Sequence, residues 1–391
     1  MGNQSFNQMR LRNAELIIHA IRKQPEVSRA DLARETDLSP ATVSSIVDEL
    51  INANVLTETG AKSTVAGRRP IGLMFNPEAG FAAGISLTPA KIGIVISDLD
   101  GNLKSEFDAP MDVITEPQKI ADECIKLMRV ACKSIGLSLS SLLAIGIAAP
   151  GPFRDEHLPI PGLRRPGEVF ENTKLLLSRK LGVPIAVDTL VNMAALAEIN
   201  SGEGVGSDCL IYFRIAHAVR SAIFSNGNML RGKFNSSGDA GHIQLPNSNR
   251  NCHCCKIGCV NGIAAWPHFQ QIASTYGISI QTEQDLMRHA VNGTKAIHEL
   301  LNECASALGF CVSAAVNLLA PDTLIISSPY LQSGQFFLDP LTSALSKYCQ
   351  RDLLTQCKIV YRNLNESNEA YGASLLAIQN YPLIKLVQDR I

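Results

Sequence analysis

A chain of 391 residues is too long for one domain of ordinary size, so two or three folded units are expected. Hydrophobic residues make up 46% of it and charged residues 18%, which supports packed cores and excludes a mainly disordered chain. The formal net charge of −1 excludes a polybasic protein of the histone type, so any binding to nucleic acid must come from a local patch.

The N-terminal residues lack the pattern of an export signal, in which a basic stretch precedes an apolar one. The longest uncharged apolar tract, residues 305–321, is too short and too interrupted to span a bilayer. We therefore expect a soluble, cytoplasmic protein that has no membrane partner.

Residues 1–75 are typical of a small helical unit. Apolar side chains recur at helical spacing through residues 8–24, and Pro25 ends this first helix. Ser28 opens a second helix, in which Asp31 completes a short capping box.

A third helix follows after a tight turn. Ser39 is its expected N-cap, and Pro40 takes the first helical position, where a missing N–H costs nothing. Its inward residues are expected to be Val43, Ile46, Val47 and Leu50. Two short helices joined in this way form a helix-turn-helix, whose second helix enters the major groove of DNA. The residues expected at the DNA are Ser39, Pro40, Ala41, Thr42, Ser44 and Ser45.

Two strands, at residues 55–59 and 71–75, are expected to flank a flexible hairpin tipped by Arg68 and Arg69, which is the pattern of a wing. Residues 1–70 hold nine Lys and Arg against eight Asp and Glu. Affinity for DNA would therefore depend on dimerisation and on a few cations placed at phosphates. The alternative is a generic three-helix domain with a polar surface.

From residue 80 onward, strand-like runs alternate with helical stretches, and the same scheme starts again at residue 208. This repetition predicts two similar α/β lobes with a cleft between them.

The cysteines are the unusual part of the composition. There are eleven cysteines, and four of them fall within residues 252–259. An odd number with four so close together does not suit a framework of paired disulfides. Cys252, Cys254 and Cys259 have the C-x-C-x4-C spacing of a thiolate knuckle, in which Gly258 lets the chain fold back. Cys255 in place of Cys254 and a chance cluster of reduced thiols are the alternatives. The others lie in apolar runs and are expected to be core thiols: Cys124, Cys132, Cys209, Cys304, Cys311, Cys349 and Cys357.

Seven motifs follow one another along nearly the whole chain: SRADLARETDLSPATVSSIVDELINANVL, GRRPIGLMFNPEAG, GIAAPGP, NMAALAE, NGNMLRG, GDAGHIQL and CHCCKIGC. In this order they resemble the ROK family (repressors, open reading frames and sugar kinases), and within it the transcriptional regulators. The resemblance implies a winged helix-turn-helix and an α/β body with the two-lobed actin/hexokinase-like (ribonuclease H-like) fold. The implied domains are residues 1–75, residues 76–195 with the C-terminal helix 370–391, and residues 196–369.

The resemblance also implies a structural zinc, a sugar between the lobes, and homodimers or homotetramers that bind operator DNA. His242 matches the family's fourth zinc ligand, beside Cys252, Cys254 and Cys259. The positions that match the family's sugar-binding residues are Asn172, Thr189, Leu190, Asp239, His242 and Asn261. Of these six positions, only Asn172 and His242 carry the residue of the family pattern. Because the other four differ from it, a ligand would bind in a different geometry.

The kinase motifs of the family are degenerate in this chain. Ser86 replaces the carboxylate of the first-strand motif, and Leu190 replaces the catalytic base. Side chains from Ala216 to Arg220 fill the second glycine-rich motif. Leucine cannot accept a proton, so the chain is not expected to be an enzyme. Asp188, two residues before the matched position, is an alternative base.

The pattern as a whole predicts a transcriptional regulator, a repressor of carbohydrate-utilisation genes, with a non-catalytic sensor body. Arg164, Arg165 and Arg220 suggest an anionic sugar derivative as effector, unless they are solvated surface residues. Two other functions stay open: a sugar kinase that keeps a DNA-binding arm, and a regulator with an empty cleft that is controlled by a protein partner.

Overall fold

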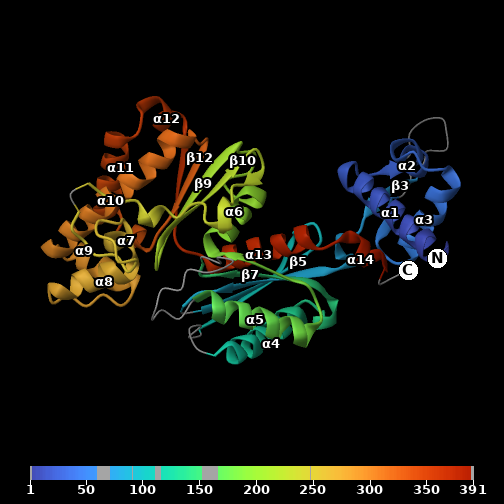
Figure 1. Ribbon diagram of the computed structural model, residues 1–391, viewed down its shortest axis with the longest axis horizontal. Coiled ribbons are helices and arrows are strands. Elements are labelled where there is room, and N and C mark those ends of the chain that lie inside the picture. Colours follow the sequence, from blue (N-terminus) through green and yellow to red (C-terminus); the bar gives the residue numbers. More distant parts are fainter. Residues whose placement is uncertain are drawn as a thin grey trace.

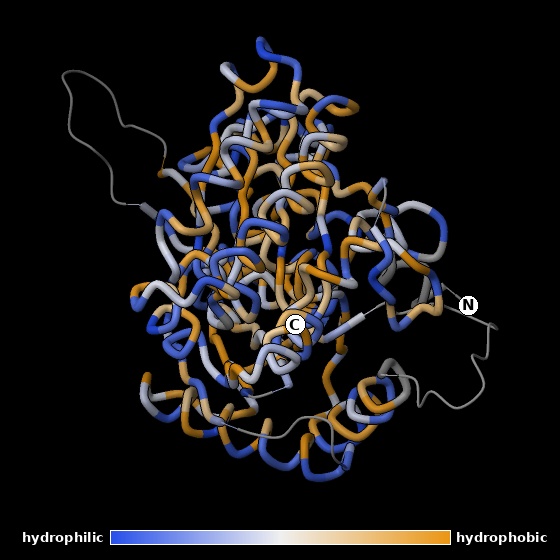
Figure 2. The backbone as a smooth tube through the Cα atoms, turned by 90° about the vertical axis from the view of Figure 1, so that its left-hand side faces the viewer, coloured by the Kyte–Doolittle hydropathy of each residue, from blue (hydrophilic) through white to orange (hydrophobic). Residues whose placement is uncertain are grey.

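The computed structural model describes residues 2–59, 71–89, 91–110, 116–151, 166–246 and 248–388. A helical N-terminal unit stands to one side of two α/β lobes (Figure 1). Hydrophobic stretches run through the interior of the lobes, and hydrophilic turns lie at their periphery (Figure 2).

The N-terminal unit is a winged helix-turn-helix, as predicted. Its elements are α1 (Gly2–Lys23), β1 (Val27–Ser28), α2 (Arg29–Thr36), α3 (Pro40–Asn52), β2 (Leu56–Thr59) and β3 (Gly72–Phe75). The strands form an antiparallel sheet in the order β1-β3-β2. The expected wing residues Arg68 and Arg69 lie outside the described residues.

Both predicted helix starts are confirmed. Ser28 Oγ accepts the backbone N–H of Asp31, whose carboxylate accepts the backbone N–H of Ser28, and this pair forms a capping box. Ser39 Oγ accepts the N–H of Thr42 at 3.1 Å, and Pro40 follows at the first helical position. The four inward side chains of α3 are buried: Val43, Ile46, Val47 and Leu50. This core fixes which face of α3 points outward.

The first lobe is a five-stranded sheet in the order β6-β5-β4-β7-β8. Its elements are β4 (Phe81–Leu87), β5 (Lys91–Asp98), β6 (Leu103–Pro110), α4 (Pro117–Ser134), β7 (Leu142–Ala149), α5 (Pro166–Leu181) and β8 (Ile185–Thr189). Helices α4 and α5 cover one face, and α13 (Glu366–Asn380) covers the other (Figure 1). A Cβ on Gly84 or Gly146 would lie 1.8 Å from a carbonyl oxygen of α13, so only glycine permits this close packing.

The second lobe repeats the scheme with the order β11-β10-β9-β12-β13. It contains β9 (Cys209–Ile215), β10 (Val219–Ser225), β11 (Asn228–Met229), α7 (Asn261–Ala264), α8 (Trp266–Thr275), α9 (Glu283–Val291), α10 (Lys295–Leu319), β12 (Thr323–Ser327), α11 (Gln335–Tyr348), α12 (Arg351–Gln356) and β13 (Lys358–Arg362). Short 3-10 turns include η3 (Lys233–Asn235) and η4 (Ala240–His242). In each lobe three antiparallel strands precede two parallel ones, which confirms the predicted pair of similar lobes.

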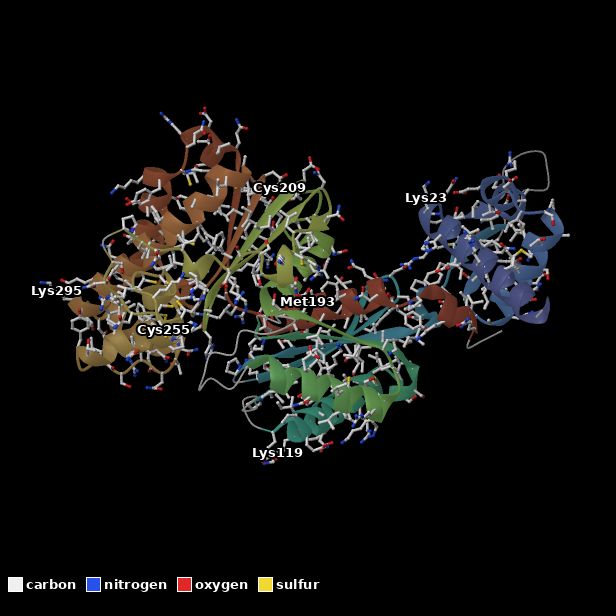
Figure 3. All side chains as sticks on the ribbon, viewed as in Figure 1. Lys23, Lys119, Met193, Cys209, Cys255 and Lys295 are labelled. Atoms are coloured by element: carbon white, nitrogen blue, oxygen red, sulfur yellow. The ribbon has the colours of Figure 1, made fainter. Side chains whose placement is uncertain are left out.

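Helix α6 (Leu190–Ser201) lies between α13 and the second sheet, so the lobe boundary predicted at residue 195 falls inside a helix. Met193, in this helix, is labelled at the junction of the lobes in Figure 3. A Cβ on Gly372 of α13 would lie 1.8 Å from the carbonyl oxygen of Met193, so these two helices are in backbone contact.

Packing and polar contacts attach the winged helix to the lobes, in addition to the chain itself. The terminal helix α14 (Leu383–Gln388) packs on α1, and its Leu386 and Val387 are buried in the same core as Ile17. Arg22 of α1 donates to the carbonyl of Leu99 in the first lobe at 3.1 Å.

Helix α10 is, within the described part of the chain, long and apolar enough to cross a membrane. However, 61% of its most apolar window is buried inside the fold, as in the core helix of a globular lobe.

Candidate metal centre and interlobe contacts

The four residues predicted as metal ligands come together in the second lobe. The ligand atoms of His242, Cys252, Cys254 and Cys259 all lie within 4.8 Å of one another. Cys252 Sγ is 3.8 Å from His242 Nδ1, and Cys254 Sγ is 3.7 Å from Cys259 Sγ. Three thiols and one imidazole make the donor set of a closed tetrahedral site. The cluster can therefore hold a metal ion.

A tight turn decides which cysteines join the cluster. The N–H of Cys252 donates to the carbonyl of Lys256 at 3.0 Å, and Gly258 has φ +87°, in the left-handed region that favours glycine. Cys255 sits in this turn with φ +67°, and its side chain is exposed and outside the cluster. Figure 3 labels it in the second lobe. The geometry brings Cys254, and not Cys255, to the other ligand atoms.

The imidazole of His242 faces a carboxylate on its other side. His242 Nε2 is 3.8 Å from Asp239 Oδ1, and Arg220 Nη2 is 3.6 Å from the same oxygen. A carboxylate behind a ligating imidazole fixes the ring orientation. Two residues expected at the effector, Asp239 and His242, thus lie side by side at the metal cluster. His253, which the sequence analysis missed although it stands between two predicted ligands, has its Nδ1 3.9 Å from Cys252 Sγ.

The remaining cysteines are mostly core thiols, as predicted. Six are buried and Cys209 is half-buried. Burial raises the pKa of the Cys124 and Cys311 thiols to about 12, and it raises the pKa of Cys132 to about 11. These groups are protonated at neutral pH and are poor nucleophiles.

We expect iodoacetamide to alkylate Cys255 of the native, metal-loaded protein first. A pKa of about 12 instead of 9.0 lowers the thiolate fraction of Cys124 roughly a thousandfold at neutral pH, and burial also blocks access. Peptide mass spectrometry before and after unfolding in urea measures both rates. Labelling of Cys124 in the native protein as fast as that of Cys255 would contradict the expectation.

Asp188 is held at the junction of the lobes. It lies at the C-terminal end of β8, is 1% exposed, and accepts the N–H of Thr189 at 2.6 Å and the amide of Asn192 at 2.7 Å. The second lobe supplies an ion pair from Arg231 and a hydrogen bond from Asn235 at 3.3 Å. Neither partner was predicted from the sequence. Asp188, the alternative base, is therefore held by groups from both lobes.

A second ion pair crosses between the lobes at Ser86. Arg214 of β9 pairs with Glu369 of α13, and their side chains are 12% and 3% exposed. Ser86 Oγ donates to Glu369 at 3.4 Å. By the resemblance, Ser86 stands where the family's kinases carry a carboxylate. A buried protein ion pair therefore lies beside that position.

The other residues predicted at the effector have structural partners or lie apart. Thr189 caps α6 through its hydroxyl, and the buried Asn261 accepts a backbone N–H of β10 at 2.7 Å. Asn172 is exposed on α5, whereas Leu190 and Ala216 are buried. The structure thus places Asp239 and His242 together, with the side chain of Asn261 against Gly241 next to them, while Thr189 caps α6.

Apart from Arg68 and Arg69, which lie outside the described residues, the residues predicted at DNA lie on α3 or at its N-cap, on the side away from the core. Exposed are Ser39, Pro40, Ala41 and Ser45, and half-buried are Thr42 and Ser44. Arg10, which the sequence analysis did not single out, reaches this face from α1 and donates to Ser45 Oγ at 2.9 Å.

Comparison with known families gives two matches. The pattern described as "ROK family" matches residues 82–380, and that described as "Winged helix-turn-helix DNA-binding" matches residues 11–57. The chain is 26% identical to the xylose repressor of Caldicellulosiruptor bescii, over 97% of this chain and 98% of that protein. It is 24% identical to the DNA-binding transcriptional dual regulator NagC of Escherichia coli, over 93% and 91% of the two chains.

Solved structures show the same fold. A ROK family transcriptional regulator, described as a homologue of the Escherichia coli MLC protein, superposes with a TM-score of 0.72 at 20% identity, covering 98% of both chains. The ROK hexokinase from Thermus thermophilus superposes with a TM-score of 0.63 at 21% identity, covering 76% of this chain and 98% of its own. The kinase fold thus corresponds to the lobes, and the regulator fold corresponds to the whole chain.

Proposed function

The chain belongs to the ROK family, and from that premise we propose that it is a DNA-binding transcriptional regulator that represses carbohydrate-utilisation genes. The observation that carries the proposal is a winged helix-turn-helix, with capped α2 and α3, joined to a ROK body. Relatives of nearly the same length are named repressors. The protein would act in the cytoplasm, where the operator is.

We propose further that the body senses a ligand and does not catalyse. Leu190 offers no proton acceptor, and Asp188 is engaged by Arg231. The pair of Arg214 and Glu369 lies beside Ser86, where a kinase needs room for metal and phosphate. If the protein is instead a kinase, purified protein with ATP and a sugar would release ADP in proportion to the sugar.

The charges between the lobes favour a neutral sugar over an anionic one. Arg220 lies beside Asp239, and Arg231 pairs with Asp188, so the charge of each arginine is balanced by a neighbouring carboxylate. The other arginines of the anionic hypothesis, at residues 164 and 165, lie outside the described residues. Calorimetric titration with neutral sugars and with their phosphates tests this point. Binding confined to the phosphates would reverse it.

Zinc is the metal we propose for the cluster of His242, Cys252, Cys254 and Cys259. Thiolates and imidazole suit Zn²⁺, and a closed set of four ligands leaves no position for substrate. The ion would supply a structural cross-link between η4 and the segment that leads into α7.

The regulator is proposed to bind DNA as a homodimer or homotetramer. Two recognition helices about 34 Å apart, or a multiple of that, would meet two half-sites on one face of the DNA. A ligand that binds one lobe arrangement better than another would change this spacing and release the operator. If no sugar shifts operator binding and a protein from the sugar-transport machinery does, control by a protein partner is favoured instead.

Replacing Ala41 with aspartate is expected to lower operator affinity at least tenfold. The new carboxylate stands in the first turn of α3, where the helix dipole tolerates it but DNA phosphates repel it. The operator is obtained by selecting duplexes from randomised DNA with the wild-type protein and sequencing them. Fluorescence anisotropy then measures affinity, with Ser140→Asp on the exposed surface of the first lobe as control. Equal binding by both variants, or no enrichment of any sequence, would refute the proposed function.

A further inference from the structure

The recognition helix has no cation of its own. Residues 40–52 contain no Lys, Arg or His, and Asp48 and Glu49 give this helix a negative formal charge. Contacts to phosphates supply most of the non-specific affinity for DNA and position a protein on the duplex. The cations at this face must therefore come from neighbouring elements.

Two arginines lie against α3 in the described part of the winged helix. Arg29 of α2 donates to Asp48 at 2.7 Å, to Glu58 of β2 at 3.1 Å, and to the carbonyl of Ser44 at 3.4 Å. With partners on two other elements, it ties α2, α3 and β2 together. This arrangement is that of a structural clamp.

Arg10 of α1 is placed differently. Its Nε donates to Glu49 at 3.1 Å, its Nη2 donates to the same carboxylate, and that Nη2 is also 2.9 Å from Ser45 Oγ. Ser45 belongs to the face expected to meet DNA, so its hydrogen bond places the guanidinium of Arg10 beside that face. The side chains of Arg10 and Glu49 are each 32% exposed, so water and other anions can reach this ion pair.

We propose that Arg10 is a phosphate contact which α1 contributes to the recognition surface, and that Glu49 holds the guanidinium until a DNA phosphate replaces the carboxylate. The two N–H groups that now grip Glu49 form the same planar fork that binds a phosphate. The inference rests on the proposed function, because it names a DNA contact of the same winged helix.

Two variants that break the same ion pair separate this role from a structural one. Arg10→Gln removes the phosphate contact, so we expect roughly tenfold weaker binding to the selected operator, and a slope of log K against log salt that is smaller by about 0.9 for each protomer on the DNA. Glu49→Gln frees Arg10, so we expect tighter binding. If the ion pair of Arg10 and Glu49 only held α1 against α3, both variants would bind the operator more weakly. Thermal unfolding of both variants serves as the fold control.

The double variant isolates Arg10 from a general charge effect. If Arg10 acts directly, Glu49→Gln tightens binding in the wild type but not in the Arg10→Gln background. Arg10→Lys, which keeps the charge, should keep the salt slope. The proposal would be overturned if Glu49→Gln tightened binding equally in both backgrounds. It would also be overturned if Arg10→Gln removed only the preference for one base pair of the operator and left the salt slope unchanged. If the wild type binds neither the selected operator nor an alternating adenine–thymine duplex, the proposed function fails as well.

Discussion

Replacing Cys259 with serine is expected to abolish stoichiometric zinc binding and to lower the thermal unfolding midpoint by roughly 10 °C. Cys259 is fully buried and has three potential co-ligands within 4.8 Å. The free energy of binding a structural zinc is also free energy of folding, since the site forms only in the folded chain. Loss of a structural metal destabilises by more than about 4 kcal/mol, and each kcal/mol shifts the midpoint of a domain of this size by about 2–4 °C.

The matched control is Cys255→Ser, four residues away. This thiol is exposed and outside the cluster, so its removal should leave both the zinc content and the midpoint unchanged. Elemental analysis of the purified proteins and calorimetry measure the two quantities. A Cys255→Ser protein without zinc would show that the assignment of Cys254 is wrong, and a Cys259→Ser protein with a full equivalent of zinc would show that Cys259 is not a ligand.

Replacing Arg214 with methionine is expected to destabilise the body by about 3–5 kcal/mol. Methionine keeps much of the side-chain volume but removes the cation that pairs with Glu369, whose side chain is 3% exposed. A buried carboxylate that loses its cation keeps the free-energy cost of desolvation but loses the ion pair that offset this cost. Urea unfolding followed by circular dichroism measures the loss.

The double variant Arg214→Met, Glu369→Gln should be more stable than Arg214→Met alone, because it carries no buried charge. Lys104 is the control within one lobe, since it pairs with the buried Asp98 between β6 and β5 at 3.2 Å. Hydrogen exchange should rise in both β4 and β9 for Arg214→Met, and in the first lobe only for Lys104→Met. Identical exchange patterns for the two single variants would contradict a link between the lobes.

Much of the DNA-binding unit was predictable because its signals are local. The capping box of Ser28 and Asp31 and the Ser39–Pro40 helix start each depend on residues three positions apart or fewer. The thiolate knuckle is local as well, because three of its ligands lie within eight residues. The repetition of strands and helices likewise predicted two lobes, since each strand carries its own apolar pattern.

The roles of Thr189 and Asn261 were not predictable from the pattern. Their positions match sugar-binding residues, but Thr189 caps α6, and the amide oxygen of Asn261 accepts a backbone N–H of β10. A buried polar side chain forms a hydrogen bond with an unpaired backbone group that the fold brings close to it. Which group that is depends on tertiary packing and not on spacing along the sequence.

The sequence by itself determined the winged helix, the pair of lobes and the metal cluster. Only the tertiary structure chose Cys254 over Cys255, because a left-handed residue turns the second thiol outward. Only the tertiary structure also paired Arg214 with Glu369 across 155 residues. Such pairs form where two strand or helix ends meet in space. Periodicity and spacing report what a segment does with its near neighbours, and they carry no information on which distant charge will face it.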